Sequence, residues 1–324
     1  MRNKVLSIII PVYNVENYIR PCMLSILNQG LEENDYEIIL INDGTLDNSF
    51  SKIDNLIKSH NNIKIIEQSN KGLSAARNIG LARAVGDYIL FIDSDDILIE
   101  NSLKRLLDIV IESKADMVVA DYIVQTEESS IHNPHINYPD TIKRIVKSGP
   151  ELLLDNLKIR DYYVWRTVYK RLFLKNNKIF FIEGITFEDS PFTFECYLKA
   201  RKCVRIEYYF YIYRRRHSTL SSTINKKSVF DLNIVIERLW NLSHQEGINP
   251  QVRERLFEHI FAIFSLNLWY ISKHNNILMK RKEIVNDLKI RVPNLVFYHG
   301  LKQHLVSFFF KTMPCAYLKI RSFI

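Results

Sequence analysis

The chain has 324 residues, of which 47% are hydrophobic and 12% aromatic, and its formal net charge at pH 7 is +8. This length and composition exclude a disordered chain and predict one large domain or two modest ones. The four cysteines, at positions 22, 196, 203 and 315, lack the spacing of metal or redox motifs, and the first ten residues lack a signal-peptide pattern. We therefore expect a reducing, cytoplasmic location.

The excess positive charge lies at the C-terminal end of the chain. From Lys273 onward there are ten lysines and arginines against two acids, whereas residues 1–272 hold 34 of each kind. A neutral body without a recognition motif argues against nucleic acid as a partner. The basic tail also carries apolar and aromatic residues, and this mixture suits a peripheral contact with an anionic membrane surface. They are Phe308, Phe309, Phe310, Tyr317, Phe323 and Ile324. A packed pair of helices with solvated basic faces is the alternative.

Short apolar runs bounded by turn residues alternate with amphipathic segments over the first 120 residues. The runs predict strands at 6–10, 37–41, 63–66, 89–92 and 117–120. The segments between them predict four helices. The first has inward residues between 19 and 27 and ends at Gln29-Gly30, the second has Ile53, Leu56 and Ile57 inward, the third spans 73–84, and apolar residues between 103 and 111 mark the fourth. This alternation predicts an α/β fold with a mostly parallel, Rossmann-like sheet flanked by helices.

The pattern changes beyond residue 120. Residues 125–148 are polar and contain Pro134 and Pro139, which predicts a long surface connection. Aromatic residues alternate loosely along residues 205–213, which predicts an exposed strand, and from about Val229 the pattern is helical.

Three carboxylates follow the predicted strand at 89–92, in the sequence Asp93-Ser94-Asp95-Asp96. The carboxyl ends of parallel strands form the ligand-binding edge of an open α/β sheet. Mg²⁺ and Mn²⁺ prefer carboxylate oxygens and are usually completed by substrate phosphates. Asp93, Ser94 and Asp95 therefore predict a site for a metal ion and a nucleotide diphosphate. In the alternative, Asp93 caps a turn, and Asp95 and Asp96 lie in the first turn of the next helix.

Four separated stretches, at residues 7–14, 41–47, 71–80 and 93–96, resemble in order and spacing those of the family 2 inverting glycosyltransferases with the GT-A fold. The resemblance is strong over residues 4–120 and thinner over residues 160–222. It implies a metal-dependent enzyme that moves a hexosyl or N-acetylhexosaminyl group from a nucleotide-diphosphate sugar, expected to be UDP-linked. The expected acceptor is a hydroxyl of a glycan or lipid-linked glycan in bacterial surface-polysaccharide assembly.

The first two stretches are suited to hold the donor's base. Pro11 closes the first strand and fixes the chain's exit, so that Val12 can offer backbone groups and Tyr13 a ring face to a flat base. Asp43 ends a neighbouring strand, where its carboxylate can accept the imide N–H of uracil. An Asx-turn with Gly44 is the alternative for Asp43.

The other two stretches are expected at the sugar and the diphosphate. Arg77 lies on a helix face of small residues, from which a guanidinium can reach the base, ribose or diphosphate, and Lys71 is assigned to the same site. The resemblance implies that Asp93 binds ribose and that Asp95 binds Mn²⁺ or Mg²⁺ directly.

Two further segments complete the predicted site. The resemblance implies that His217 is another metal ligand, and that Arg214 neutralises the charge of the departing diphosphate. Asp189 matches the family's Glu-Asp motif and is our candidate for the catalytic base, with Glu188 orienting the acceptor or the loop. Ser190 and Pro191 predict the start of a helix directly after these acids, so a partnership with the helix dipole is the alternative for Asp189.

We expect a catalytic domain at residues 1–222, with a donor half at 1–120 and an acceptor half at 121–222. A helical region at 223–324 follows, with the basic tail at its end. Trp165 either lines the acceptor pocket or belongs to the core. A dinucleotide oxidoreductase is disfavoured because Gly-x-Gly-x-x-Gly is absent from the sequence. A non-catalytic protein that binds sugar nucleotides is the alternative function.

Overall fold

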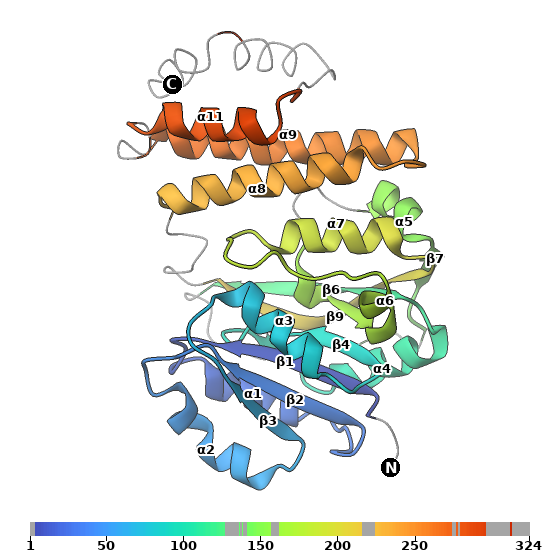
Figure 1. Ribbon diagram of the computed structural model, residues 1–324. Coiled ribbons are helices and arrows are strands. Elements are labelled where there is room, and N and C mark those ends of the chain that lie inside the picture. The colour runs from blue at the N-terminus through green and yellow to red at the C-terminus, as the bar shows by residue number, and fades with distance from the viewer. Residues whose placement is uncertain are drawn as a thin grey trace. The chain divides into compact units, whose positions relative to one another are not determined.

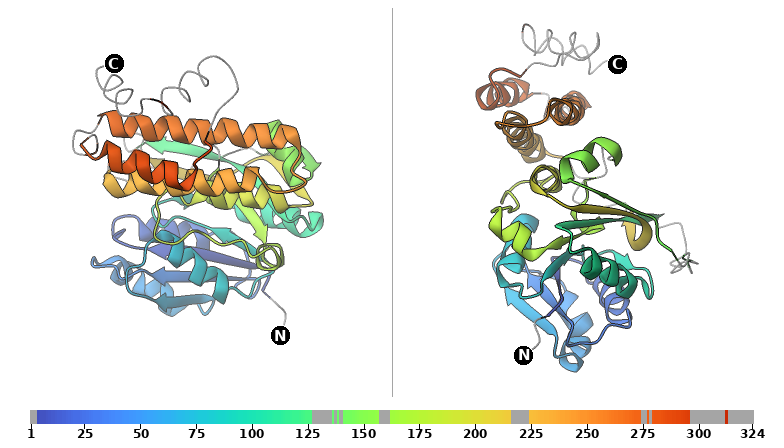
Figure 2. Two further views of the ribbon diagram at one scale, coloured as in Figure 1. Left: turned by 45° about the horizontal axis from the view of Figure 1, so that its top comes forward. Right: turned by 90° about the vertical axis from the view of Figure 1, so that its right-hand side faces the viewer.

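The structure is a computed structural model that describes residues 4–126, 136, 138, 141–156, 162–215, 224–273, 277, 279–295 and 312 (Figures 1 and 2). The contacts divide the chain into two compact units. The first is formed by Met1–Leu152, Tyr163–Gly184 and Glu195–His217, and the second by Leu153–Tyr162, Ile185–Phe194 and Ser218–Ile324. This division follows contacts and does not test the predicted boundary at residue 222 between a catalytic domain and a helical region. That boundary stays a prediction.

The described part of the first unit contains a nine-stranded mixed sheet with the order β3-β2-β1-β4-β8-β6-β9-β5, in which β7 pairs with β9 (Figure 1). The strands are β1 Leu6–Val12, β2 Tyr36–Asn42, β3 Ile63–Glu67, β4 Tyr88–Phe91, β5 Ile97–Leu98, β6 Met117–Thr126, β7 Arg144–Lys147, β8 Thr167–Lys170 and β9 Cys203–Arg215. The helices that accompany this sheet are α1 Ile19–Leu27, α2 Ser49–Ser59, α3 Leu73–Arg83, α4 Ser102–Ser113 and α6 Arg171–Asn176, with a 3₁₀ turn η1 at Val164–Arg166.

The first four strands in this order are parallel, as the alternation of strands and helices in the sequence predicts. In β1, alternate side chains point to opposite faces. Ile8 and Ile10 belong to a core cluster with buried residues of α1, α2 and α4, whereas Ile9 faces α3. Helices therefore cover both faces of the sheet (Figure 2). Every residue of β1 is buried, which explains why all of its residues except Ser7 are apolar.

Helix α3 lies unusually close to the sheet. A Cβ atom added to Gly80 would be 2.4 Å from Cγ2 of Ile9, and Ala75 and Ala76 beside it are also buried. The predicted close packing of this small-residue face is confirmed. Arg77, on the same helix, is buried as well.

The second half of the sheet differs from the prediction. Strand β8 is antiparallel to both β4 and β6, and β9 is antiparallel to β5 and β7 while parallel to β6. The expected surface connection at 125–148 contains β7, whose short, polar sequence carries no strong strand signal. The expected exposure of the strand at 205–213 is wrong, because Tyr208, Phe210 and Tyr211 are buried. Strand β9 has hydrogen-bonded neighbours on both sides, so its aromatic residues pack into the core.

The second unit is mainly helical, as predicted for the C-terminal region. Helices α8 Lys226–Ser243, α9 Pro250–Lys273 and α11 Arg281–Arg291 pack together, and α5 Gly149–Asn156 and α7 Asp189–Lys199 each belong to it in part. Asn225 caps α8 in a capping box with Ser228. Within this bundle the Asn267 amide donates to the side-chain oxygen of Asn233 at 2.8 Å, which pairs two buried polar groups.

No helix within the described residues is long and apolar enough to cross a membrane. The aromatic residues predicted to contact a membrane surface, Phe308 to Phe310, Tyr317, Phe323 and Ile324, lie outside the described residues.

We predict that Gly80→Ala destabilises the protein, because the new methyl group would meet Ile9 far inside van der Waals contact. Overpacking of this kind costs about 1–3 kcal/mol of unfolding free energy, which urea denaturation measures. Addition of Ile9→Ala should restore part of the close fit, so the double variant should lose less than the sum of the two single losses. Additive losses would show that α3 and β1 do not meet closely here.

Candidate functional site

The loops that follow β1 and β2 are joined by hydrogen bonds at the carboxyl edge of the sheet. Asn14, which has a positive φ of 53°, donates its backbone N–H to Oγ1 of Thr45 at 2.8 Å. Asp47 accepts the Glu16 N–H at 2.8 Å. Two segments separated by about thirty residues are thereby held as one surface beside the ends of both strands.

This surface carries the predicted base-binding residues. Pro11 and Val12 are buried, and the Val12 carbonyl accepts the Asp43 N–H at 3.2 Å. Tyr13 is 39% exposed, so its ring lies at the surface directly after the strand. The sequence prediction placed Tyr13 and Asp43 in one site, and this hydrogen bond joins Asp43 to Val12, the residue directly before Tyr13.

Asp43 is a buried carboxylate with three donors from one loop. It accepts hydrogen bonds from Gln68 Nε2 at 2.6 Å, from the Lys71 N–H at 2.8 Å and from the Gly72 N–H at 2.9 Å. A carboxylate offers about four acceptor positions. Asp43 uses three of them to hold the loop that leads into α3. Sequence reasoning missed Gln68, which carries no motif signal. Lys71 is exposed and meets Asp43 through its backbone.

In the turn after β2, the side chain that accepts a backbone hydrogen bond within the turn is that of Asn42, and not the Asp43 side chain of the Asx-turn alternative. Asn42 Oδ1 accepts the Thr45 N–H at 3.0 Å, which closes the turn after β2. The local turn and the carboxylate are therefore supplied by two successive residues with separate roles.

Arg77 is almost completely buried, with 1% of its surface exposed. Its Nη2 donates to Oδ1 of Asp93 at 2.7 Å, and its guanidinium lies 5.2 Å from the ring centre of Phe181. An ordinary solvent-exposed arginine is thus excluded. Asp93 is 26% exposed. The buried Arg77 therefore orients a carboxylate that is itself accessible at the surface.

Asp96 has a structural position that the sequence did not reveal. It is fully buried and accepts the Tyr211 hydroxyl at 2.7 Å and the Arg214 N–H at 2.7 Å. Burial, followed by the negative charges of Asp95 and Asp93, raises the pKa of Asp96 well above its ordinary value. The predicted alternative of a helix N-terminus is wrong, because β5 comes next and α4 begins at Ser102.

Arg214 fixes the same turn from strand β9. Its Nε donates to the carbonyl oxygen of Asp95, its Nη2 donates to the carbonyl oxygen of Tyr18 at 3.3 Å, and the guanidinium lies 5.3 Å from the Tyr18 ring centre. The guanidinium thus holds the backbone around Asp95, while the Asp95 side chain is half-buried and Ser94 is buried. The predicted contact of Arg214 with diphosphate stays a prediction.

The carboxylates of Asp93 and Asp95 are suited to a hard divalent cation whose remaining coordination positions are filled by a bound substrate. The described residues contain no group of three or more His, Cys, Asp and Glu side chains that could hold a metal. One or two protein carboxylates are nevertheless sufficient to bind Mg²⁺ when substrate phosphates supply the other oxygens. Asp93 and Asp95 are two such carboxylates in one turn. The predicted ligand His217 lies outside the described residues.

Trp165 belongs to the core. It is 2% exposed and is stacked on Tyr163 at 4.8 Å and on Tyr211 at 4.3 Å between ring centres. The Tyr211 hydroxyl in turn accepts the Asp93 N–H at 3.2 Å. The aromatic stack therefore supports the acid turn from within the first unit.

The candidate base lies in the second unit. Helix α7 begins at Asp189 itself, one residue before the predicted cap. Asp189 is half-buried, Glu188 is buried, and Phe187 before them has a positive φ of 65°. A left-handed conformation costs a bulky residue roughly 1–3 kcal/mol and persists where the surroundings enforce it, often at functional sites. The convergence of Asp189 with Asp95 stays a prediction.

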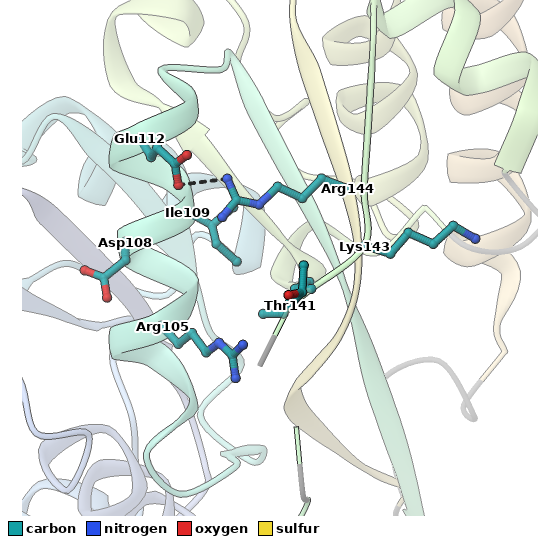
Figure 3. Close-up of a pocket in the computed structure, with 8 residues that line it drawn as sticks. Arg105, Asp108, Ile109, Glu112, Thr141, Lys143 and Arg144 are labelled. Atoms are coloured by element: carbon teal, nitrogen blue, oxygen red, sulfur yellow. Dashed lines mark hydrogen bonds and ion pairs between the residues drawn. The ribbon is translucent and has the colours of Figure 1, made fainter. Parts of the chain in front are cut away.

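An open groove of about 540 Å³ lies between α4 and residues 141–144 (Figure 3). Arg144 crosses it to Glu112 at 2.8 Å, and none of the predicted site residues lines it. The groove therefore gives no support to the predicted donor site.

The sequence matches the model of glycosyl transferase family 2 over residues 7–177, which is more than half of the chain. The chain belongs to glycosyl transferase family 2. It is 35% identical over 221 residues to the uncharacterized glycosyltransferase EpsJ of Bacillus subtilis, an alignment that covers 66% of this chain and 62% of EpsJ. It is 34% identical over 216 residues to a poly(ribitol-phosphate) beta-glucosyltransferase of Bacillus spizizenii, which covers 65% of this chain and 32% of that protein.

The family 2 chain also resembles the S. aureus protein TarS, residues 1–349, in complex with UDP-GlcNAc. The TM-score is 0.71 at 21% identity, with 89% of this chain and 80% of that chain covered. This likeness confirms the expected GT-A fold. The alignments cover 62% of EpsJ and 32% of the poly(ribitol-phosphate) beta-glucosyltransferase. The chain therefore matches less than two thirds of the length of each of these two relatives.

We predict that Arg77→Met lowers the unfolding free energy and weakens UDP binding, because it leaves the Asp93 carboxylate without its buried counter-charge. Breaking a fully buried pair costs several kcal/mol. Since Asp93 is 26% exposed, we expect roughly 1–3 kcal/mol after allowance for solvent screening. Urea denaturation and UDP titration calorimetry measure the two effects. Arg83→Met, an exposed change on the same helix, is the control, and equal behaviour of the two variants would contradict this role.

Proposed function

We propose that this protein is a metal-dependent, inverting glycosyltransferase that uses a UDP-sugar. The observation that carries the proposal is the alignment of polar residues at the ends of three adjacent parallel strands. Tyr13 follows β1, Asp43 follows β2, and the acid turn follows β4, in the order β2-β1-β4. Ligands bind at this edge in open α/β sheets. Family membership and the UDP-GlcNAc bound to the structurally similar TarS support the same donor class.

The donor would lie along this edge with its base at Tyr13 and its phosphates toward Asp95. The Tyr13 ring offers a flat apolar face, and Asp43 has acceptor capacity beyond its three loop hydrogen bonds. Asp93, which accepts a hydrogen bond from Arg77, would accept hydrogen bonds from ribose hydroxyls. Pro11, Val12, Ser94 and Lys71 form the supporting backbone of this site.

Asp95, with Asp93 nearby, would hold Mn²⁺ or Mg²⁺ together with the diphosphate oxygens, and His217 is the proposed additional ligand. When bound, such an ion offsets the negative charge that builds up on the leaving UDP. The protein's own contribution is to keep the two carboxylates in place through Arg77 and Arg214.

The reaction is a single displacement. An acceptor hydroxyl oxygen attacks the anomeric carbon from the face opposite UDP, and the new C–O bond forms as the bond to the diphosphate oxygen breaks. UDP leaves with the bonding electron pair, the hydroxyl proton passes to the Asp189 carboxylate, and the configuration at the anomeric carbon is inverted. Glu188, which is buried directly before Asp189, would orient the acceptor or the turn.

The proposed acceptor is a hydroxyl of a glycan, a polyol-phosphate polymer or a lipid-linked glycan. A relative at 34% identity is named as a glucosyltransferase that acts on poly(ribitol-phosphate). A lipid-linked acceptor would be met at the cytoplasmic face of the cell membrane, where the basic tail at residues 300–324 could bind anionic lipid.

The proposal is tested by incubation of the purified protein with UDP-GlcNAc, UDP-glucose and UDP-galactose in the presence of Mn²⁺, with UDP release as the measurement. We predict that Asp189→Asn lowers kcat by roughly 10²–10⁴, because the amide cannot accept the proton, while UDP affinity changes little. Glu246→Gln, an exposed acid of the same unit, should leave kcat unchanged. Binding without turnover in the parent protein would instead favour a non-catalytic sugar-nucleotide-binding role.

A separate prediction concerns the metal. EDTA should abolish UDP release, and added Mn²⁺ should restore it. In Asp95→Asn, titration calorimetry should find UDP affinity nearly independent of Mn²⁺, because the variant has lost an anionic ligand. Glu100→Gln, an exposed acid just beyond this turn, should keep the Mn²⁺ dependence. An Asp95→Asn protein with full Mn²⁺ dependence would remove Asp95 from the metal site.

A further inference from the structure

The turn that carries Glu188 and Asp189 is anchored on both sides by the C-terminal helices of its own unit. On the preceding side, Thr186 donates its N–H at 2.9 Å and its hydroxyl at 3.1 Å to Oδ2 of Asp231 in α8. On the following side, the Ser190 hydroxyl is hydrogen-bonded to Nε2 of His259 in α9 at 2.8 Å. The two anchors therefore enclose the residues between them, 187–189.

The Asp231 anchor is a buried acidic side chain. Its carboxylate accepts both Thr186 hydrogen bonds and pairs with Lys227, one helical turn earlier, at 2.6 Å. Hydrogen bonds to an ionised acceptor are stronger than neutral ones. Lys227 is mostly exposed. Its ammonium group neutralises the Asp231 carboxylate from the solvent side, while Oδ2 of Asp231 accepts the hydrogen bonds of Thr186.

The His259 anchor cannot easily rotate away. The imidazole is 3% exposed, is stacked on Phe194 at 4.3 Å and meets the edge of Tyr162 at 4.9 Å between ring centres. Thr193 closes the group by donating its hydroxyl to the Tyr162 carbonyl oxygen at 2.8 Å. The rings fix the imidazole orientation, and the imidazole in turn fixes Ser190, the residue next to Asp189.

The enclosed backbone needs such support. Phe187 has the left-handed φ of 65°, a conformation that a phenylalanine adopts rarely and leaves readily when its neighbours are released. The position of the Asp189 carboxylate depends on this backbone. Misplacement of a catalytic group by about 1 Å can cost about 100-fold in rate.

We infer that Asp231 and His259 are positioning residues that hold the Glu188–Asp189 turn in its reactive geometry. The inference rests on the proposed role of Asp189 as base. The helices α8 and α9 are thereby part of the machinery of sugar transfer and do not act as a separate appendage.

The test compares His259→Leu with Asn267→Leu. Both changes remove a buried, hydrogen-bonded polar side chain from α9, but Asn267 pairs with Asn233 of α8. Hydrogen–deuterium exchange of the peptide covering residues 186–192 should become about tenfold faster in His259→Leu than in Asn267→Leu. Equal exchange in the two variants at equal global stability would overturn the inference, whatever their activities are.

The kinetic arm uses UDP release from UDP-GlcNAc with Mn²⁺ and water as acceptor. His259→Leu should lower kcat about 10- to 100-fold with an unchanged KM for UDP-GlcNAc, and His259→Gln, which keeps a side-chain hydrogen-bonding group, should recover most of it. In the Asp189→Asn background, His259→Leu should cause no further loss. A full additional loss there would show that His259 acts through something other than Asp189.

The two arms separate two kinds of failure. If Asp189→Asn turns over UDP-GlcNAc as fast as the parent protein, the proposed base is wrong, and the exchange experiment still decides whether the turn is clamped. If Asp189→Asn is inactive but His259→Leu matches Asn267→Leu in both arms, the proposed function stands and the positioning role is wrong.

Discussion

The buried carboxylate of Asp96 is the interaction on which the donor edge of the first unit depends. It accepts the Tyr211 hydroxyl and the Arg214 N–H, and so ties the turn after β4 to strand β9, more than a hundred residues later in the chain. A buried acceptor that lost these donors would be strongly unfavourable. These two hydrogen bonds therefore stabilise the turn that carries Asp93 and Asp95.

A second constraint fixes the same turn from the opposite face of the sheet. Helix α3 can approach β1 closely because Gly80 has no side chain, and this approach brings the buried Arg77 within 2.7 Å of Asp93. Arg77 and Arg214 thus act on neighbouring acids in different ways. Arg77 compensates the charge of a side chain, whereas Arg214 holds a backbone through carbonyl oxygens. Three acids so close together are tolerable only when each has a distinct environment.

The second unit uses the same design around Glu188 and Asp189. Buried polar side chains from two helices, Asp231 and His259, reach the chain on either side of an unfavourable backbone conformation at Phe187. In both units, partly exposed carboxylates, those of Asp93, Asp95 and Asp189, lie in turns that buried polar side chains from other elements hold in place. This division explains why a motif alone does not specify a working geometry.

Local patterns in the sequence determined the first four parallel strands, the helices between them and the motifs that resemble family 2 glycosyltransferases, because short, mostly apolar runs and turn residues act over a few positions. The carboxylates at 93–96 could be recognised as a group, but their separate roles could not. The burial of Asp96, the ion pair of Arg77 and the core position of Trp165 depend on neighbours between about 16 and 118 residues away. Likewise, the antiparallel strands β5, β7 and β8 are too short or too polar to show a period, and their pairing with distant strands defines them. A linear pattern records which side a residue faces, whereas contacts between distant segments arise when the chain is packed in three dimensions.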